Sequence, residues 1–128
     1  MINIFRNEYG WLSNMTSVPI YYKGYNFNSV ESAYLWCKNP TDQLWLDKCL
    51  NKAPNLVKRD SRELVLPDNW NETKLLVMEE LLVIKFNQEP FKSKLIATGN
   101  ENIQEGNMWG DKFLVFVLNL NLTKVKII

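Results

Sequence analysis

Two ionisable side chains, Glu31 and Lys38, lie seven residues apart in a segment that is predicted to be helical. Seven residues make about two helical turns, so both side chains would lie on one helix face, about 10 Å apart along the axis. A carboxylate can stabilise a developing cation, and a lysine can act on the same substrate as an acid or as a nucleophile. The same spacing is also common in solvated surface pairs, so the spacing by itself does not establish a site.

A second polar group lies in a segment that ends at Asp111 and is expected to be a loop between structured elements. Trp109 could stack on a base, and Gly110 would let the backbone approach a ligand closely. Asp111 and Glu105 could stabilise a cation or orient water, with the amide of Asn107 beside them. The alternative is a loop whose Trp109 folds back onto the core.

Ser13 and Asn14 form a third polar pair, directly after a turn with glycine and an aromatic residue. Their side chains could hydrogen-bond a ribose or a phosphate, although a capping or turn role is the more common use of these residue types. Residues 58–62 are predicted to be a solvated turn, in which Arg59 or Arg62 could face a phosphate.

The composition limits the chemistry that these residues can perform. The chain has 128 residues, 46% of them hydrophobic, which is enough for one domain with its own core. It contains no histidine, so histidine-dependent catalytic triads and zinc sites with histidine ligands are excluded. Its two cysteines, Cys37 and Cys49, are too few for a structural zinc site and favour a reduced, cytoplasmic compartment. Any enzymatic activity must therefore depend on carboxylates, amines, hydroxyls and water.

The charge balance indicates the class of partner. The chain has 15 basic and 14 acidic residues, and a net charge of +1 is too small for tight, sequence-independent binding to nucleic acid. The longest strongly apolar run, residues 81–84, is too short to span a membrane, and the first residues lack the pattern of a signal peptide. We therefore expect a cytoplasmic protein without a membrane association, and a small nucleotide is compatible with its charge.

The elements that would position these residues are predicted by hydrophobic periodicity and by capping residues. A short strand is expected in the first five residues, and a hairpin with a Lys23–Gly24 turn over residues 18–27. The predicted helices span residues 30–38 after an Asn28–Ser29 cap, 42–51 after a Thr41 cap, 72–87 after an Asn71 cap and 91–98 after Pro90, with a short helix and a loop over 53–66.

The helix over residues 72–87 is apolar around most of its surface, so it is expected to be the central helix. A β-rich tail is expected over residues 113–128. Together these elements predict a single α+β domain over residues 1–128, predominantly helical, with a short N-terminal hairpin.

Several ordered segments of the sequence resemble the NADAR domain family, also known as YbiA-like N-glycosidases. The matching segments are Ile4–Phe5, Leu12–Met15, Pro19–Ile20, Gly24, Ser29–Glu31, Lys38, Trp70, Met78, Lys85–Gln88, Leu95–Gly99 and Glu105–Asp111. The resemblance covers most of the chain and implies the compact, predominantly helical fold of that family.

The resemblance implies hydrolysis of the N-glycosidic bond between a ribose and a base. Its substrate would be ADP-ribosylated guanine, free or in a nucleic acid, or a related ribosylated nucleotide such as an intermediate of riboflavin synthesis. Glu31 matches the family's catalytic glutamate, Lys38 the lysine that closes the same helix, and Asp111 the family's acid. The residues that match the nucleotide pocket are Ser13, Asn14, Asn107, Trp109 and Gly110, with Glu105 in the same segment. No metal and no cofactor is implied.

The chemistry of the bond is consistent with these residue types. Cleavage builds positive charge on the anomeric carbon, so Glu31 or Asp111 would stabilise the transition state. Lys38 would act on the ribose or the base, or would form a Schiff base with the ring-opened sugar.

Three departures from the family pattern leave two other functions open. Ser32 and Leu35 stand where relatives often have histidine and glutamine. The residues after Asp111 also lack the usual aromatic and Trp-Gly pattern, and residues 119–128 stand where relatives usually continue through a Gly-rich segment into a final helix. The alternatives are a non-catalytic module that binds ADP-ribose or another NAD derivative, and a small partner-binding protein that retains only the family core.

Overall fold

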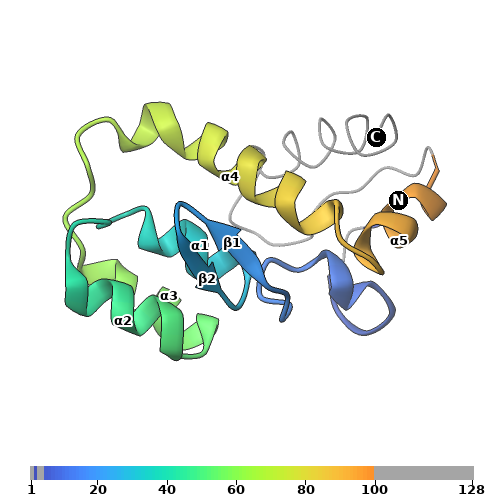
Figure 1. Cartoon of the computed structure of the whole chain (residues 1–128), viewed down its shortest axis with the longest axis horizontal. Helices are drawn as coiled ribbons and strands as arrows, with labels where there is room; N and C mark the ends of the chain where they lie inside the picture. Colours follow the sequence, from blue (N-terminus) through green and yellow to red (C-terminus); the bar gives the residue numbers. More distant parts are fainter. Residues whose placement is uncertain (1, 3–4, 100–128) are drawn as a thin grey trace.

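The computed structural model describes residue 2 and residues 5–99 of the chain (Figure 1). In chain order the elements are the 3-10 helix η1 (Asn7–Leu12), strands β1 (Ile20–Tyr22) and β2 (Tyr25–Phe27), helices α1 (Val30–Trp36), α2 (Gln43–Asn51) and α3 (Pro54–Asp60), the 3-10 helix η2 (Ser61–Glu63), and helices α4 (Trp70–Phe86) and α5 (Phe91–Ala97). A mostly helical fold with one small sheet is therefore confirmed. The predicted β-rich tail, residues 113–128, lies outside the described residues. Within the described part, no helix is both long and apolar enough to cross a membrane.

Helix α1 lies at the centre of the described fold. All 7 of its residues are buried, and it packs against α2, α3, α4 and both strands. In Figure 1 the hairpin lies in front of α1, α4 runs above it, and α2 and α3 lie below. The prediction that α4 is the central helix was wrong, because α4 keeps one side toward solvent, where Leu76 is 57% exposed. Helix α4 has more apolar residues than its buried side needs, which is why periodicity misplaced it.

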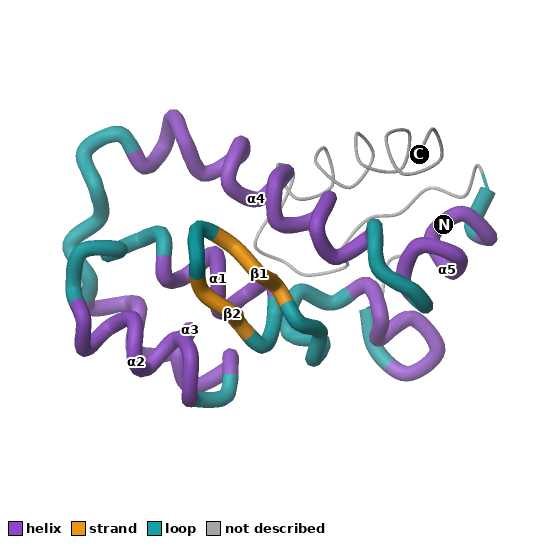
Figure 2. The backbone as a smooth tube through the Cα atoms, in the orientation of Figure 1, coloured by secondary structure: helices purple, strands orange, loops and turns teal. Residues whose placement is uncertain are grey.

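The predicted hairpin is present, and it covers one side of α1 (Figure 2). In the antiparallel pair β1–β2, Ile20 lies opposite Phe27, and both are buried. Lys23 and Gly24 form the turn with φ values of 49° and 92°, the left-handed backbone that a tight two-residue hairpin turn requires. Phe27 packs on Trp36 of α1 with 5.4 Å between ring centroids, so the hairpin is joined to α1 by aromatic contact.

Helix α1 begins where predicted because Ser29 caps it. The Ser29 hydroxyl accepts a hydrogen bond from the Ser32 backbone N–H (3.0 Å) and donates one to the Ser32 hydroxyl (3.1 Å). Both serines are buried. At its other end the helix stops at Trp36, and Lys38 follows in a turn. The prediction that Lys38 lies on the same helix as Glu31 was therefore wrong, because Lys38 lies two residues beyond the end of the helix.

Three other boundaries can be compared with the predictions. Asp42, rather than Thr41, caps α2, because its carboxylate accepts hydrogen bonds from two backbone N–H groups of the first turn (2.9 and 3.3 Å). Helix α4 begins at Trp70, two residues before the predicted start, whereas the predicted start of α5 at Phe91 is confirmed. Helix η1 was not predicted, and residues 1, 3 and 4 of the expected first strand lie outside the described residues.

Helix α4 buries one stripe of side chains, and that stripe includes a lysine. Its buried residues are Trp70, Met78, Leu81, Leu82, Lys85 and Phe86. Lys85 is 0% exposed, and its Nζ lies 5.1 Å from the ring centroid of Phe86 and 5.2 Å from that of Phe91. Burial lowers the pKa of Lys85 to about 7, because the charged ammonium loses its hydration there.

The two cysteines are both free thiols, and neither is well exposed. Burial raises the pKa of Cys37 to about 11 and the pKa of Cys49 to about 12. Both side chains are therefore protonated and uncharged at neutral pH, and they contribute to the fold as small apolar groups.

The lowered pKa of Lys85 predicts that the stability of the fold depends on pH. The folded pKa is about 7 and the ordinary lysine value is 10.5, so the unfolded state binds more protons between these two values. The free energy of unfolding should therefore rise as the pH increases above about 7, by at most about 1.4 kcal/mol per pH unit from this group. Urea unfolding of the wild type between about pH 6 and about pH 9 measures the slope.

The variant Lys85→Met isolates this contribution, because methionine has a similar length and no charge. The wild type should gain stability relative to Lys85→Met as the pH rises through the same interval. Lys92→Met, which changes a partly exposed lysine of α5, is the matched control and should leave the slope of the wild type unchanged. Equal slopes for the wild type and Lys85→Met would contradict the prediction.

Candidate active site

The turn that contains Ser13 and Asn14 is fixed to two helices. Lys85 Nζ of α4 donates a hydrogen bond to the Ser13 carbonyl oxygen (2.8 Å). The Asn14 carbonyl oxygen accepts one from the backbone N–H of Glu31 in α1 (3.0 Å). The Asn14 side-chain amide also lies 3.8 Å from the sulfur of Met78 in α4. The turn therefore bridges α1 and α4, and it brings two of the predicted binding residues next to Glu31.

The hydroxyl of Ser13 has the turn role that is common for serine. Its oxygen accepts a hydrogen bond from the backbone N–H of Met15 (3.1 Å). A second bond, from the Thr16 hydroxyl to the Gly10 carbonyl (2.6 Å), closes the same turn from the side of η1. In this bond the Ser13 hydroxyl acts as an acceptor, so among the described residues no acceptor takes its proton.

Glu31 lies in the first turn of α1 and is 9% exposed. Its backbone N–H is one of the first-turn groups that have no acceptor within a helix, and the Asn14 carbonyl satisfies it. The carboxylate is largely shielded from water. Electrostatic interactions with a bound cation are stronger in such a place than on an open surface.

Lys38 lies close to Glu31 although it is beyond the end of the helix. Its Nζ is 5.8 Å from the ring centroid of Tyr34, and Tyr34 packs on Trp70 with 5.2 Å between centroids. Burial is the largest effect on the pKa of Lys38 and lowers it below the ordinary lysine value, while the nearby Glu31 carboxylate opposes this shift. A lowered pKa increases the fraction of neutral amine, which is the nucleophilic form.

Two further lysines, Lys58 of α3 and Lys74 of α4, act on Lys38 by like-charge repulsion and lower its pKa further. Lys58 belongs to the segment predicted to be a solvated turn, which is the end of α3 in the structure. The sequence analysis missed both residues because they come from separate elements and meet Lys38 only through the packing of α1 against α3 and α4. Among the described residues, Lys58 and Lys74 therefore add positive charge close to Lys38.

The structure brings together the predicted residues that it describes, namely Ser13, Asn14, Glu31 and Lys38. The other predicted site residues lie outside the described residues, namely Glu105, Asn107, Trp109, Gly110 and Asp111. Their place in the site stays a prediction. In the described part of the chain, no group of three or more Cys, Asp or Glu side chains is arranged to hold a metal ion.

Lys85 is a residue at this site that the sequence analysis missed, although the pattern contained a signal. Met78, Leu81, Leu82 and Lys85 follow the spacing of one buried helix face. A charged residue at a core position of such a face is unusual, and it indicates a specific buried partner. Here the partner is the Ser13 carbonyl.

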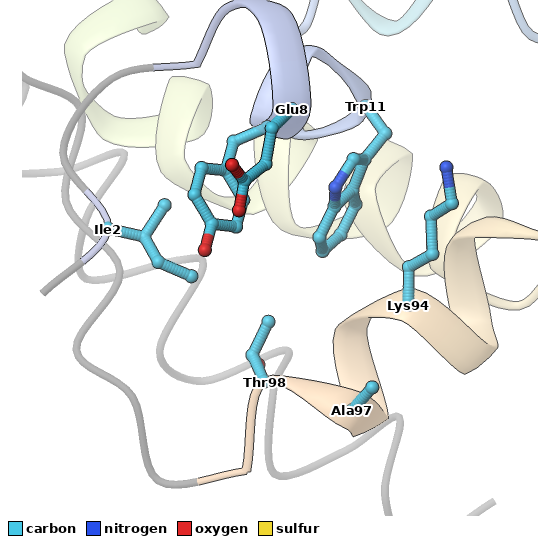
Figure 3. A pocket seen from close by; sticks show the side chains of 7 residues that line it. Ile2, Glu8, Trp11, Lys94, Ala97 and Thr98 are labelled. Atoms are coloured by element: carbon cyan, nitrogen blue, oxygen red, sulfur yellow. The ribbon is translucent and has the colours of Figure 1, made fainter.

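A cavity of about 370 Å³ lies between η1 and α5 (Figure 3). The residues that line it are Ile2, Glu8, Tyr9, Trp11, Lys94, Ala97 and Thr98. Figure 3 shows the Trp11 ring on the η1 side and Thr98 and Ala97 on the α5 side. Its lining, as far as the described residues go, does not include Glu31, Asn14 or Lys38.

Known proteins provide two independent comparisons. A model of the NADAR domain matches residues 4–114 of the chain. The structure is similar to the NMR structure of the E. coli protein YbiA, with a TM-score of 0.82 and 22% sequence identity, over 99% of this chain and 88% of that one. No match is found among curated protein sequences. The similarity to YbiA concerns the fold, whereas the family model covers most of the sequence, and on that basis the chain belongs to the NADAR domain family.

Proposed function

We propose that this protein is an N-glycosidase that hydrolyses the bond between ribose and base in an ADP-ribosylated guanine or a related ribosylated nucleotide. The strongest support is the pair formed by Glu31 and Lys38, a buried carboxylate beside a lysine whose pKa is lowered. The NADAR family is associated with N-glycosidase activity, which supports the same class of reaction. The specific substrate is proposed from the family resemblance and from the charge around the site.

Glu31 is proposed to stabilise the positive charge that develops at the anomeric carbon, either as the glycosidic bond breaks directly or as the sugar ring opens. Positive charge develops on the anomeric carbon, and a carboxylate with little access to water interacts strongly with it. The Asn14 carbonyl holds the backbone N–H of Glu31, so the carboxylate is carried by a fixed helix end. Asp111, which lies outside the described residues, is proposed as the second acid.

Lys38 is proposed to form a Schiff base with the ring-opened sugar when the base is attached through an amino nitrogen. Ring opening leaves C1 doubly bonded to that nitrogen, and the neutral amine of Lys38 adds to C1. The bond from C1 to the base then breaks as the base takes a proton, and water hydrolyses the lysine imine to release the sugar aldehyde. Burial favours the neutral amine that starts this sequence.

Lys58 and Lys74 are proposed to favour a substrate that carries phosphate. Both lie close enough to Lys38 to repel its charge, so they add positive potential beside the pair. A diphosphate would reduce this repulsion on binding. An uncharged nucleoside would gain nothing from it, which is why a nucleotide such as ADP-ribose fits the site better.

Ser32 supports a mechanism without histidine. It stands where relatives often have that residue, but here it is fully buried and its hydroxyl is bonded to Ser29. Its side chain therefore belongs to the helix cap and does not face a substrate. We propose that proton transfer in this chain falls to Glu31, Lys38 and Asp111.

The first test is the release of guanine-containing product from ADP-ribosylated guanosine by the wild type and by Glu31→Gln. The variant keeps the size of the side chain and removes the charge, so the rate should fall by about 10²-fold or more. Glu63→Gln, which changes an exposed acid of η2, is the control and should retain the wild-type rate. Full activity of Glu31→Gln would exclude this carboxylate from the chemistry. A wild type that binds ADP-ribose in calorimetry without any release would instead indicate the binding module.

The Schiff base predicts a covalent product. Borohydride reduces an imine to a stable amine, so its addition during turnover should attach the sugar to Lys38. Mass spectrometry of the peptides locates the adduct. Lys38→Ala should give none, and Lys58→Ala should still give the adduct at Lys38. Continued turnover without any adduct at Lys38 would contradict the Schiff-base route.

Phosphate recognition predicts a selective effect of Lys58→Met on KM. We expect KM for the ADP-ribosylated substrate to rise by up to about fivefold, the size of one exposed ion pair, while KM for the corresponding ribosylated base without phosphate stays constant. Lys52→Met, which changes an exposed lysine directly after α2, is the control. Equal changes in KM for both substrates would show that Lys58 does not act on the phosphates.

A further inference from the structure

We infer that Lys85 is a positioning residue, whose bond to the Ser13 carbonyl fixes the Ser13–Asn14 turn against the first turn of α1 and so sets the place of Glu31 relative to Asn14. The part that Glu31 plays in catalysis rests on the proposed function. The contacts between Lys85, the turn and α1 are independent of it.

The burial of Lys85 requires a specific reason. Removing an ammonium from water is unfavourable unless hydrogen bonds and other interactions compensate. Among the described residues its nitrogen has one hydrogen-bond acceptor, the Ser13 carbonyl, and the faces of Phe86 and Phe91 beside it. A methionine would fill a similar space in the stripe without that loss of hydration. The lysine therefore has a role beyond packing, and within the described residues its amine makes one hydrogen bond, to the Ser13 carbonyl of the turn.

The bond is placed where it controls the geometry of the site. The Ser13 carbonyl belongs to the planar peptide group that joins Ser13 to Asn14. Holding this carbonyl fixes the plane, and the next carbonyl along the chain, that of Asn14, accepts the N–H of Glu31. A continuous path of two hydrogen bonds and two peptide groups thus runs from α4 to the residue proposed to stabilise the cation.

The other contacts of the turn do not replace this bond. The Ser13 hydroxyl bonds to Met15 within the turn itself, so it shapes the turn without attaching it to a helix. The contact of the Asn14 amide with the Met78 sulfur is long, at 3.8 Å, and sulfur is a weak acceptor. Lys85 is therefore the strong attachment of the turn to α4.

Hydrogen exchange of two neighbouring amides tests this role without any substrate. The Glu31 amide is bonded to Asn14, across the turn, whereas the Ser32 amide is bonded to Ser29 within the helix cap. In the full chain carrying Lys85→Met, the Glu31 amide should exchange about tenfold faster than in the wild type, and the Ser32 amide should change much less. Site-resolved NMR measures both rates in one sample.

Two further variants complete the experiment. Lys85→Gln keeps an N–H donor without the charge, so it should restore much of the protection of Glu31. Lys92→Met should leave both amides as in the wild type. Equal acceleration of the Glu31 and Ser32 amides in Lys85→Met would show that Lys85 only supports the fold, and this result would overturn the inference. The absence of any acceleration would also overturn it.

A kinetic measurement then separates the inference from the proposed function. With ADP-ribosylated guanosine, Lys85→Met should lower kcat more than it changes KM, and Lys85→Gln should recover part of kcat. If the wild type releases no product, the proposed function fails, and the exchange rates alone decide whether Lys85 positions the turn. A variant that loses Glu31 protection but keeps the wild-type kcat would overturn the role of Lys85 in the site.

Discussion

Helix α1 has no side that faces solvent, and much of the described structure follows from this constraint. A buried helix needs neighbours around its whole circumference, and α2, α3, α4 and the hairpin provide them. It also needs acceptors for the N–H groups of its first turn, because water cannot reach them in the interior. Ser29, the residue directly before the helix, provides one acceptor, and the Asn14 carbonyl provides another from a turn that is distant in the sequence. The hydrogen bond that satisfies the Glu31 N–H therefore also brings Ser13 and Asn14 next to Glu31.

The parts of the fold that depend on near neighbours could be predicted from the sequence. The Lys23–Gly24 turn and the Ser29 cap are local features, and both were predicted at the observed residues. The central position of α1 could not be predicted, because it depends on which surfaces the other elements cover. The pattern of α1 is short and mixed, with Glu31 among apolar residues, whereas α4 is long and apolar on nearly all sides. Apolar content indicates how much a helix can bury, but it does not indicate how much its neighbours will cover.

The proximity of Glu31 and Lys38 was predicted from the sequence, but the reason given for it, a shared helix face, was wrong. Glu31 and Lys38 lie close together, but the shared helix face that led to this prediction ends at Trp36. The surrounding lysines are separated along the chain and could not be associated with Glu31 without the packing of three helices. Lys85 could have been found from its place in an apolar stripe, although its acceptor, a backbone carbonyl, has no signature in the sequence. Every residue type has the same backbone groups, so a sequence motif cannot indicate contacts such as those of the Ser13 and Asn14 carbonyls.

The buried thiols have a practical consequence for work on this protein. The thiolate is the form of cysteine that reacts with alkylating reagents and oxidants. With pKa values of about 11 and about 12, Cys37 and Cys49 have very little thiolate at neutral pH. A cysteine introduced at an exposed position, such as Lys23 in the hairpin turn, would therefore react far faster than either native residue. A fluorophore or spin label can thus be attached at one chosen position of the natural sequence, without first replacing Cys49 in the core or Cys37 at its edge.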